Sequence, residues 1–308
     1  MNHEDTMNFC RAEFERTRID DEELKRLCRE RVSRFQPHVR TAITEILEIV
    51  ARRIHDKVPL SLIRIGNGEG NAISMTKSVI HEPMFRTFCI EFCSQNHYGL
   101  DMENAIMFCR EVVSAIENAD IIGFRCFYFN ENDIIRKDLG RGNAYGALGM
   151  TYAREFLKDG LINHKFSNKF VTSAWIHLDF VPHLDALFST SEKIVIVTGQ
   201  VGLENEFERR LGSKLNRFIA VPAQGYVPAS FAESHYASRF LQVKQDLSTN
   251  LEGCLVLVGA GLFGKVYCDI AKLHGAVAID LGSVFDVLCG LNTRPIFSHY
   301  KFEGAAWV

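Results

Sequence analysis

The stretch PLSLIRIGNGEGN, residues 59–71, contains the signal that decides the fold. Residues 60–65 are mostly long or β-branched apolar side chains, so they predict a buried strand that ends in a tight loop. The glycines of this loop are Gly66, Gly68 and Gly70. They let a ligand approach the main chain, while Asn67 and Glu69 supply an amide and a carboxylate. A plain strand-to-helix turn with a capping Asn and an acidic first turn explains the same residues.

Beyond this loop, short apolar segments alternate with amphipathic ones. Strands are predicted at residues 120–125, 169–175, 193–198, 217–221, 254–258 and 276–280. Helices are predicted at residues 69–77, 102–118, 180–188, 203–211 and 230–247, and a Gly-rich polar region at 141–150 precedes another helix. Continuous apolar strands separated by helices are typical of a Rossmann-like α/β fold, a doubly wound and mostly parallel sheet. Ligands of such sheets lie beyond the carboxyl ends of the strands.

The N-terminal part of the chain has a different pattern. From about residue 13 to residue 57 the sequence is strongly helical, and Pro37 divides it into two helices. We therefore predict an N-terminal helical segment over residues 1–58 and an α/β domain over residues 59–308.

Composition excludes several classes of protein. The 308 residues are 47% hydrophobic and carry a net charge of −3, so the chain can bury a core and we expect no nucleic acid partner. The nine cysteines are scattered without a CxxC pair, which fits reduced thiols in the cytoplasm. The N-terminus has no apolar signal region, and no stretch approaches the roughly 20 apolar residues that span a bilayer. We expect a cytoplasmic protein.

A second glycine-rich turn, in the sequence VGAGLFGK, follows the predicted strand at 254–258. Gly259, Gly261 and Gly264 form a G-x-G-x-x-G pattern, and Asp280 lies 21 positions after the first of them. The pattern meets the conditions for a dinucleotide fingerprint, in which amides at a helix start bind a pyrophosphate and the acid binds a ribose. Its place near the C-terminus argues against NAD, and a βα turn that simply needs small residues is the plain alternative.

Polar groups continue after this unit. Asp280 ends the predicted strand, Ser283 follows, and Asp286 lies one turn into the next predicted helix. Two carboxylates so placed could converge on a sugar, a metal or a base position. Asp286 alone also fits an acidic first-turn residue that complements the helix dipole.

With both turns in view, the chain resembles the GT-D-fold glycosyltransferases, bacterial enzymes of surface-glycan assembly. That family has the strand and loop S-L-x-R-x-G-D-G-E, and SLIRIGNGE at residues 61–69 follows it closely. The family's later βα turn and strand are matched by Gly261, Gly264, Lys265, Ile279, Asp280 and Gly282. The resemblance covers roughly residues 59–290. It implies that residues 59–308 form a nucleotide-sugar-binding catalytic domain of GT-D type.

The family's D-x-E motif implies a divalent metal, Mn²⁺ or Mg²⁺, that helps to hold the sugar diphosphate. Here the first carboxylate of that motif is replaced by Asn67, which leaves Glu69 and a neutral amide oxygen as metal ligands. The loss of one negative charge should weaken the binding of either ion. Either Glu69 suffices together with the diphosphate, or the reaction needs no metal, or transfer activity has been lost.

The resemblance implies a hexosyltransferase-type enzyme that moves a sugar from a nucleoside-diphosphate sugar to a hydroxyl of a glycan acceptor. The expected catalytic residues are Glu69, Asp280 and Asp286. The expected substrate-binding residues are Arg64, Gly66, Asn67, Gly68, Gly259, Gly261, Gly264, Lys265 and Ser283. Two alternatives stay open, an NAD(P)-dependent oxidoreductase that uses the second turn and a catalytically silent nucleotide-binding module.

The same resemblance suggests partners. Acceptors of this pathway are often lipid-linked, so the protein would work at the inner face of the membrane. The Arg-bearing N-terminal helix is the candidate for peripheral membrane contact. Homo-oligomerisation is also compatible with the sequence.

Overall fold

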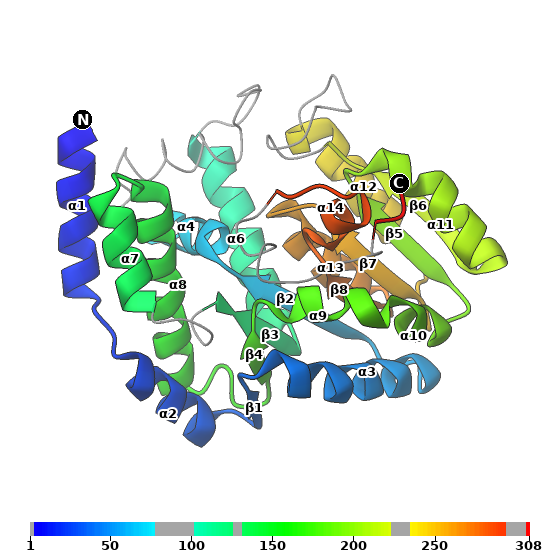
Figure 1. Cartoon of the computed structure of the whole chain (residues 1–308), viewed down its shortest axis with the longest axis horizontal. Coiled ribbons are helices and arrows are strands. Elements are labelled where there is room, and N and C mark those ends of the chain that lie inside the picture. Colours follow the sequence, from blue (N-terminus) through cyan, green and yellow to red (C-terminus); the bar gives the residue numbers. More distant parts are fainter. Residues whose placement is uncertain (1–2, 78–101, 126–130, 223–234, 294–305) are drawn as a thin grey trace. The chain divides into compact units, whose positions relative to one another are not determined.

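The computed structural model describes residues 3–77, 102–125, 131–222, 235–293 and 306–308 (Figure 1). Close packing divides the chain into two units, the first made of residues 1–38 and 64–174 and the second of residues 39–63 and 175–308. This division does not follow the predicted boundary between residues 58 and 59. The reason is that the N-terminal helices pack within the first unit, whereas the helix before residue 58 packs within the second.

The strands of the first unit lie in the order β1-β4-β3-β2. Their bounds are β1 Arg34–Gln36, β2 Leu60–Ile65, β3 Ile121–Phe124 and β4 Phe170–Ser173. Both β1 and β3 pair with β4 in parallel, with Arg34 and Ile121 each opposite Phe170. Only the last two residues of β2 belong to this unit, because the strand begins in the other one.

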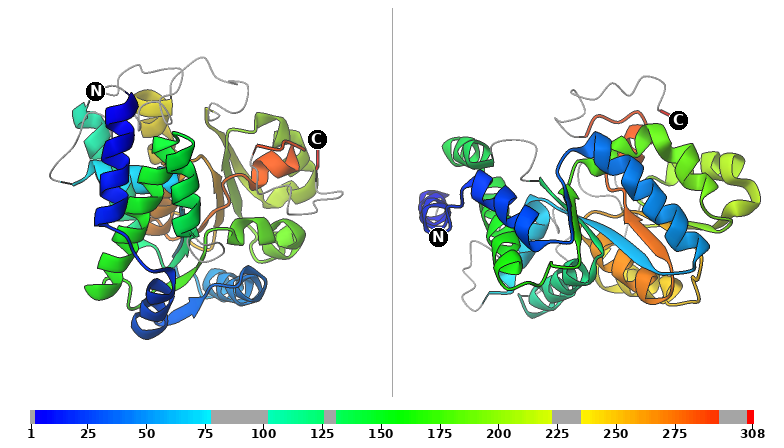
Figure 2. Two further views of the ribbon diagram at one scale, coloured as in Figure 1. Left: turned by 60° about the vertical axis from the view of Figure 1, so that its left-hand side comes forward. Right: turned by 90° about the horizontal axis from the view of Figure 1, so that it is seen from below.

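The strands of the second unit lie in the order β2-β8-β7-β5-β6. The further bounds are β5 Ile194–Thr198, β6 Leu215–Ala220, β7 Leu255–Gly259 and β8 Val277–Asp280. Each described pair is parallel, and Val277 of β8 lies opposite both Leu60 and Leu255. Figure 2 shows α12 (Phe240–Leu247) and α13 (Phe263–Leu273) on one face of these strands and α3 (Val39–His55) on the other. The predicted doubly wound parallel α/β fold is therefore confirmed.

Helix α8 is the centre of the first unit's helical layer. The helices of this unit are α1 His3–Arg16, α2 Asp21–Arg31, α4 Asn67–Met75, α6 Met102–Asn118, α7 Glu131–Gly140 and α8 Ala144–Ile162. Of these, α1, α2, α4 and α7 pack against α8, and Figure 1 shows α1, α7 and α8 side by side. Helix α6 has the bounds predicted from its apolar periodicity.

The predicted division at Pro37 is found, with α2 before it and a helix at Val39–His55 after it, but the part before Pro37 is two helices and a short strand. Helix α1 ends at Arg16, and α2 begins after Asp20, whose Oδ1 accepts hydrogen bonds from the backbone of Glu22 and Glu23. The chain is extended at Val32 and enters β1, which ends before Pro37 because proline has no backbone N–H to donate to a neighbouring strand.

The helix predicted after the Gly-rich polar region at residues 141–150 begins inside that region. Asn143 caps α8 through a hydrogen bond from the backbone N–H of Gly146, 3.0 Å long, and α8 starts at Ala144. The small residues of this stretch are buried in the helix, where they allow close packing.

The second unit has helices on both sides of its strands. Its α-helices are α3 Val39–His55, α9 Ile176–Asp179, α10 Leu184–Ser189, α11 Glu204–Leu211, α12 Phe240–Leu247, α13 Phe263–Leu273 and α14 Val284–Leu288. A π-helical turn at His235–Arg239 directly precedes α12. The predicted helix at 230–247 thus contains a π turn, and its residues 230–234 lie outside the described part.

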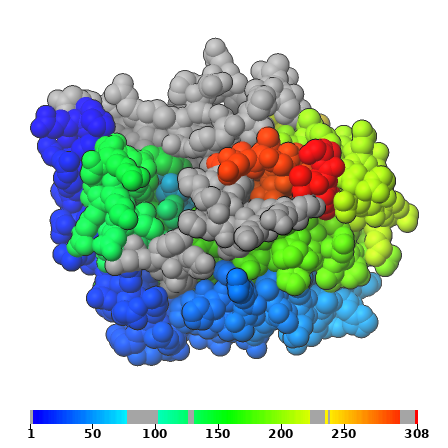
Figure 3. Space-filling view, in the orientation of Figure 1, coloured from blue at the N-terminus to red at the C-terminus, as the bar shows by residue number. Residues whose placement is uncertain are grey.

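The C-terminal residues pack within the second unit. The Trp307 backbone N–H donates to the Leu288 carbonyl at 2.7 Å, and its ring lies 5.1 Å from that of Phe207. Figure 3 shows these red residues against α14 and α11. Within the described ranges, none of the helices has the length and apolar content needed to cross a bilayer.

Candidate functional site

The predicted loop of the first unit is the start of helix α4. Gly66 is the N-cap residue in an extended conformation, and its backbone N–H donates to Glu69 Oε2 at 2.8 Å. Glu69 thus closes a capping box on its own helix, as the plain interpretation predicts for an acidic first turn. Asn67 is the first helical residue and not the cap. Arg64, Asn67, Gly68 and Glu69 are all half-buried, so a ligand can reach this loop.

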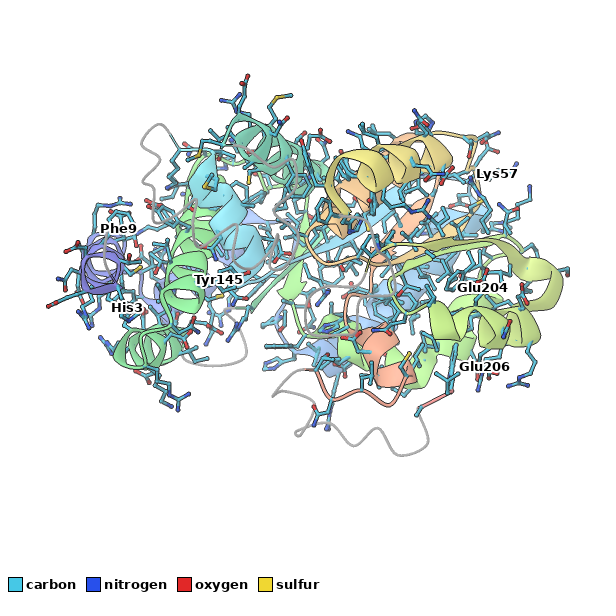
Figure 4. All side chains as sticks on the ribbon, turned by 90° about the horizontal axis from the view of Figure 1, so that it is seen from above. His3, Phe9, Lys57, Tyr145, Glu204 and Glu206 are labelled. Atoms are coloured by element: carbon cyan, nitrogen blue, oxygen red, sulfur yellow. The ribbon has the colours of Figure 1, made fainter. Side chains whose placement is uncertain are left out.

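The backbone of α8 holds this loop in place. A Cβ atom on Gly149 would lie 2.1 Å from the Asn67 carbonyl oxygen, and one on Gly70 would lie 1.7 Å from the Gly149 oxygen. The buried Asn71 amide donates to the carbonyls of Asn67, at 3.0 Å, and Tyr145, at 3.1 Å. Figure 4 labels Tyr145 on its helix. Two glycines and one amide therefore fix where Asn67 and Glu69 lie.

A divalent metal at this loop would find few protein ligands. Glu69 is the single carboxylate of the motif, and one of its oxygens already accepts the Gly66 N–H. Over the described ranges, His, Cys, Asp and Glu side chains form no group of three or more that could hold an ion. Mg²⁺ is commonly held by one or two carboxylates together with substrate phosphates. These donors alone do not complete an ion site, and the Mn²⁺ or Mg²⁺ remains a prediction.

In the second unit, the glycines of the other turn have different structural roles. A Cβ on Gly259 would lie 2.2 Å from Cδ2 of Phe285, and one on Gly264 would lie 3.1 Å from Cγ1 of Val258. Gly261 has a φ of +55°, which L side chains rarely adopt. The Phe285 ring thus covers the first position of the G-x-G-x-x-G pattern.

Lys265 and Asp280 form a buried ion pair beside this turn. Lys265 Nζ lies 2.6 Å from Asp280 Oδ2 and 3.4 Å from the Gly261 carbonyl oxygen. Lys265 is 3% exposed and Asp280 is 1% exposed. Asp280, predicted to hold a ribose or act as a base, therefore binds Lys265, which was predicted to bind substrate. Nothing in the sequence indicated this ion pair.

Asp286 is held at both of its oxygens. Gln200 Nε2 donates to Oδ1 at 2.8 Å, and the Thr293 hydroxyl donates to Oδ2 at 2.6 Å. Gln200 follows β5 and Asp286 lies in α14 after β8, so the pair links two strand ends of the second unit. Asp286 is half-buried and keeps contact with solvent.

Ser283 has a histidine partner. Its Oγ lies 3.2 Å from Nε2 of His177, whose ring stacks on Trp175 with centroids 6.1 Å apart. His177 is buried and Ser283 is half-buried. In the sequence, His177 follows the strand predicted at residues 169–175, and this position was the only sign of a functional role. No sequence pattern connected it with Ser283.

A second histidine of this unit, His235, lies beside the start of α13. Its Nε2 is 2.7 Å from the Tyr267 hydroxyl, and its ring stacks on Phe263 at 4.0 Å. Burial, and to a lesser degree the Arg239 charge, lowers the pKa of His235 to about 3, so the ring is neutral at physiological pH. No sequence motif indicated this residue.

The predicted site residues thus fall into two groups, one in each unit. The first unit brings together Arg64, Gly66, Asn67, Gly68 and Glu69 where β2 ends. The second brings together Gly259, Gly261, Gly264, Lys265 and Asp280, with Ser283 and Asp286 directly after β8.

The family model of the GT-D fold-like domain matches residues 41–288. The match covers well over half of the chain, so the chain belongs to this family, which is of glycosyltransferase type. The predicted resemblance is confirmed.

A solved structure described as the selenomethionine-substituted domain of unknown function 1792 is similar over 88% of this chain and 87% of that chain. Its sequence identity is 16% and its TM-score is 0.45. A search of the curated proteins found no match.

Proposed function

We propose that this protein transfers a hexosyl group from a nucleoside-diphosphate sugar to a hydroxyl of a glycan acceptor in bacterial polysaccharide or glycoconjugate assembly. The observation that carries the proposal is the half-buried loop from Gly66 to Glu69, which joins a strand end to a helix start and presents a carboxylate there. Helix starts attract phosphate groups, and ligands of parallel sheets bind at strand ends.

Negative charge grows on the leaving diphosphate as the sugar–phosphate bond breaks, and fixed positive groups must neutralise it. In the first unit we assign this role to Arg64 and to the backbone N–H groups at the start of α4, with Gly66, Asn67 and Gly68 lining the approach. A bound Mn²⁺ or Mg²⁺, held by Glu69, Asn67 and the diphosphate, would add further neutralisation.

The second unit carries candidate groups of its own. In its glycine-rich turn, Gly261 is half-buried and would contact a bound ligand, whereas the Phe285 ring covers Gly259 and Gly264 is buried. Lys265 would act through its ion pair and not by touching a phosphate, because it is almost completely buried.

An inverting reaction would need a base for the acceptor hydroxyl. Of the two predicted carboxylates, Asp286 is the better candidate, because Asp280 is buried and bound to Lys265. Ser283 would orient the hydroxyl, with His177 as its hydrogen-bond partner.

An NAD(P)-dependent oxidoreductase fits this geometry less well. In that class the acid after the second strand binds the ribose, and the first glycines leave room for the pyrophosphate. Here Asp280 binds Lys265, and the Phe285 ring covers Gly259.

Donor binding should show which class is right. In a panel of UDP-, GDP-, CMP- and dTDP-sugars, we expect one of the diphosphate sugars to raise the melting temperature, with a larger shift in Mn²⁺ than in EDTA, because a ligand that binds only the folded state stabilises it. NAD and NADP should give no shift. Stabilisation by NAD alone would overturn the proposal, binding without turnover would favour the silent module, and equal shifts in Mn²⁺ and EDTA would remove the metal from it.

Glu69→Gln tests the loop directly. Gln can still accept the Gly66 N–H, so the helix cap and the fold should persist, but the negative charge is lost. We expect sugar transfer to fall by about a hundredfold or more, as for the loss of other single charge-stabilising groups. Transfer is measured by product formation and folding by circular dichroism. Glu103→Gln, an exposed first-turn acid on α6, is the matched control. Undiminished transfer by the Glu69 variant would refute the assignment.

A further inference from the structure

Glu131, the first residue of α7, is a buried carboxyl group that the proposed reaction does not use. It is 0% exposed, and among the described residues neither of its oxygens has a hydrogen-bond partner. Burial of an ionised carboxylate without hydrogen bonds is costly, so groups of this kind call for an explanation.

Charged groups face Glu131 from several elements. Arg125, the residue after β3, places its Nε 4.0 Å from Glu131 Oε1. Arg154 of α8 is buried, pairs with Asp21 of α2 and donates to the Ile19 carbonyl at 2.6 Å. Asp138 of α7 adds a negative charge.

These groups leave Glu131 able to change its charge near neutrality. Burial raises the pKa of Glu131 to about 7, and the charges of Arg125 and Arg154 offset that rise only in part. The negative charges of Asp21 and Asp138 also raise the pKa of Glu131.

Arg125 is the member of this group that a ligand can approach. Its side chain is 23% exposed, whereas that of Arg154 is 3% exposed. It follows β3 directly, and β3 is the neighbour of β2, whose end carries the loop from Gly66 to Glu69. Strand ends of a parallel sheet are where anionic ligands bind, and a guanidinium can bind a phosphate through two hydrogen bonds.

We infer that Arg125 is a binding position for a phosphate-bearing ligand and that Glu131 is the buried counter-charge which the bound anion replaces. The inference deepens the proposed function and rests on it for the identity of the ligand, a sugar diphosphate. An anion on Arg125 repels the ionised Glu131 carboxylate, so binding favours its protonated form. The site should therefore take up a proton when it binds an anion, and its affinity should fall as pH rises through 7.

Sulfate is a suitable probe, because its charge does not change between pH 6 and pH 8.5. We expect ¹⁵N NMR of the Arg125 Nε–H group to shift during a sulfate titration. Sulfate should bind about tenfold more tightly at pH 6 than at pH 8.5. This is the difference expected if bound sulfate raises the pKa of Glu131 by about one unit. Equal affinity at the two pH values would overturn the inference.

Three variants separate the roles. Glu131→Gln should bind sulfate with the same affinity at both pH values, close to that of the wild type at pH 6. The double variant Arg125→Gln with Glu131→Gln removes both charges of the pair, so neither is left buried alone. It should bind sulfate at least tenfold more weakly than the single variant Glu131→Gln. Asp133→Asn, an exposed acid on the same helix, should behave as the wild type.

Wild-type affinity in the double variant would contradict the role of Arg125, and persisting pH dependence in Glu131→Gln would contradict that of Glu131. The titration needs no sugar transfer. A failure here and a failure of the transferase proposal are thus separate results.

Discussion

Replacing Lys265 with methionine is expected to lower the free energy of unfolding by about 3–5 kcal/mol, the cost of breaking a buried ion pair from one side. Methionine keeps most of the length of the side chain, but it leaves the Asp280 carboxylate in the core without its ammonium partner. That carboxylate is 1% exposed and cannot be hydrated without opening the turn after β7. Urea unfolding followed by circular dichroism measures the loss.

The double variant Lys265→Met with Asp280→Asn removes both charges and should recover more than half of the loss. Lys57→Met is the control, because Lys57 forms an exposed ion pair with Glu252 in the same unit and should lose much less stability. If Lys265→Met cost no more than this control, or if the double variant were as unstable as the two single losses added together, the pair would not stabilise the fold as inferred.

This pair also explains why part of the candidate site could not be predicted from the sequence. The spacing from Gly259 to Asp280 indicates a phosphate and ribose site, since a pattern describes the backbone and residue types. Which polar side chains meet each other depends on their directions after packing. Lys265 on α13 and Asp280 on β8 point into the same buried space, and no spacing rule contains that fact.

The strands were predictable for a simple physical reason. Parallel strands covered on both faces are continuous apolar runs, and residues 194–198 and 255–258 are completely buried as that rule requires. Helix α6 was predictable because its apolar positions recur with the helical period. The loop from Gly66 to Glu69 was placed correctly at a strand end because glycines directly follow an apolar run.

The division into units was not predictable in this way, because long-range packing decides it. Helix α3 follows β1 in the chain but packs with α9 and β8, which are distant in the sequence. Glu131 was missed for a related reason. An acidic residue at a helix start ordinarily faces solvent, and only tertiary packing buries this one.

Gly149→Ala is the other change for which we expect a large effect, a loss of about 3 kcal/mol or more in the free energy of unfolding. In a free helix this substitution would be stabilising, because alanine is the better helix former by about 1 kcal/mol. Here the new methyl group would lie 2.1 Å from the Asn67 carbonyl oxygen, a backbone atom that cannot move without its helix. Either α4 separates from α8 or the loop that carries Asn67 and Glu69 shifts, so the variant should also lose donor binding.

Gly140→Ala provides the matched control, because it also lies in a helix of the first unit and a Cβ there has no atom within 4 Å. The sign of the effect should therefore differ between the two glycines, with Gly140→Ala neutral or slightly stabilising and Gly149→Ala strongly destabilising. Thermal unfolding and nucleotide-sugar binding measured on both variants separate the contact from helix propensity. A Gly149→Ala protein as stable as the control would mean that α8 does not hold the loop, and the candidate donor site would lose its structural support.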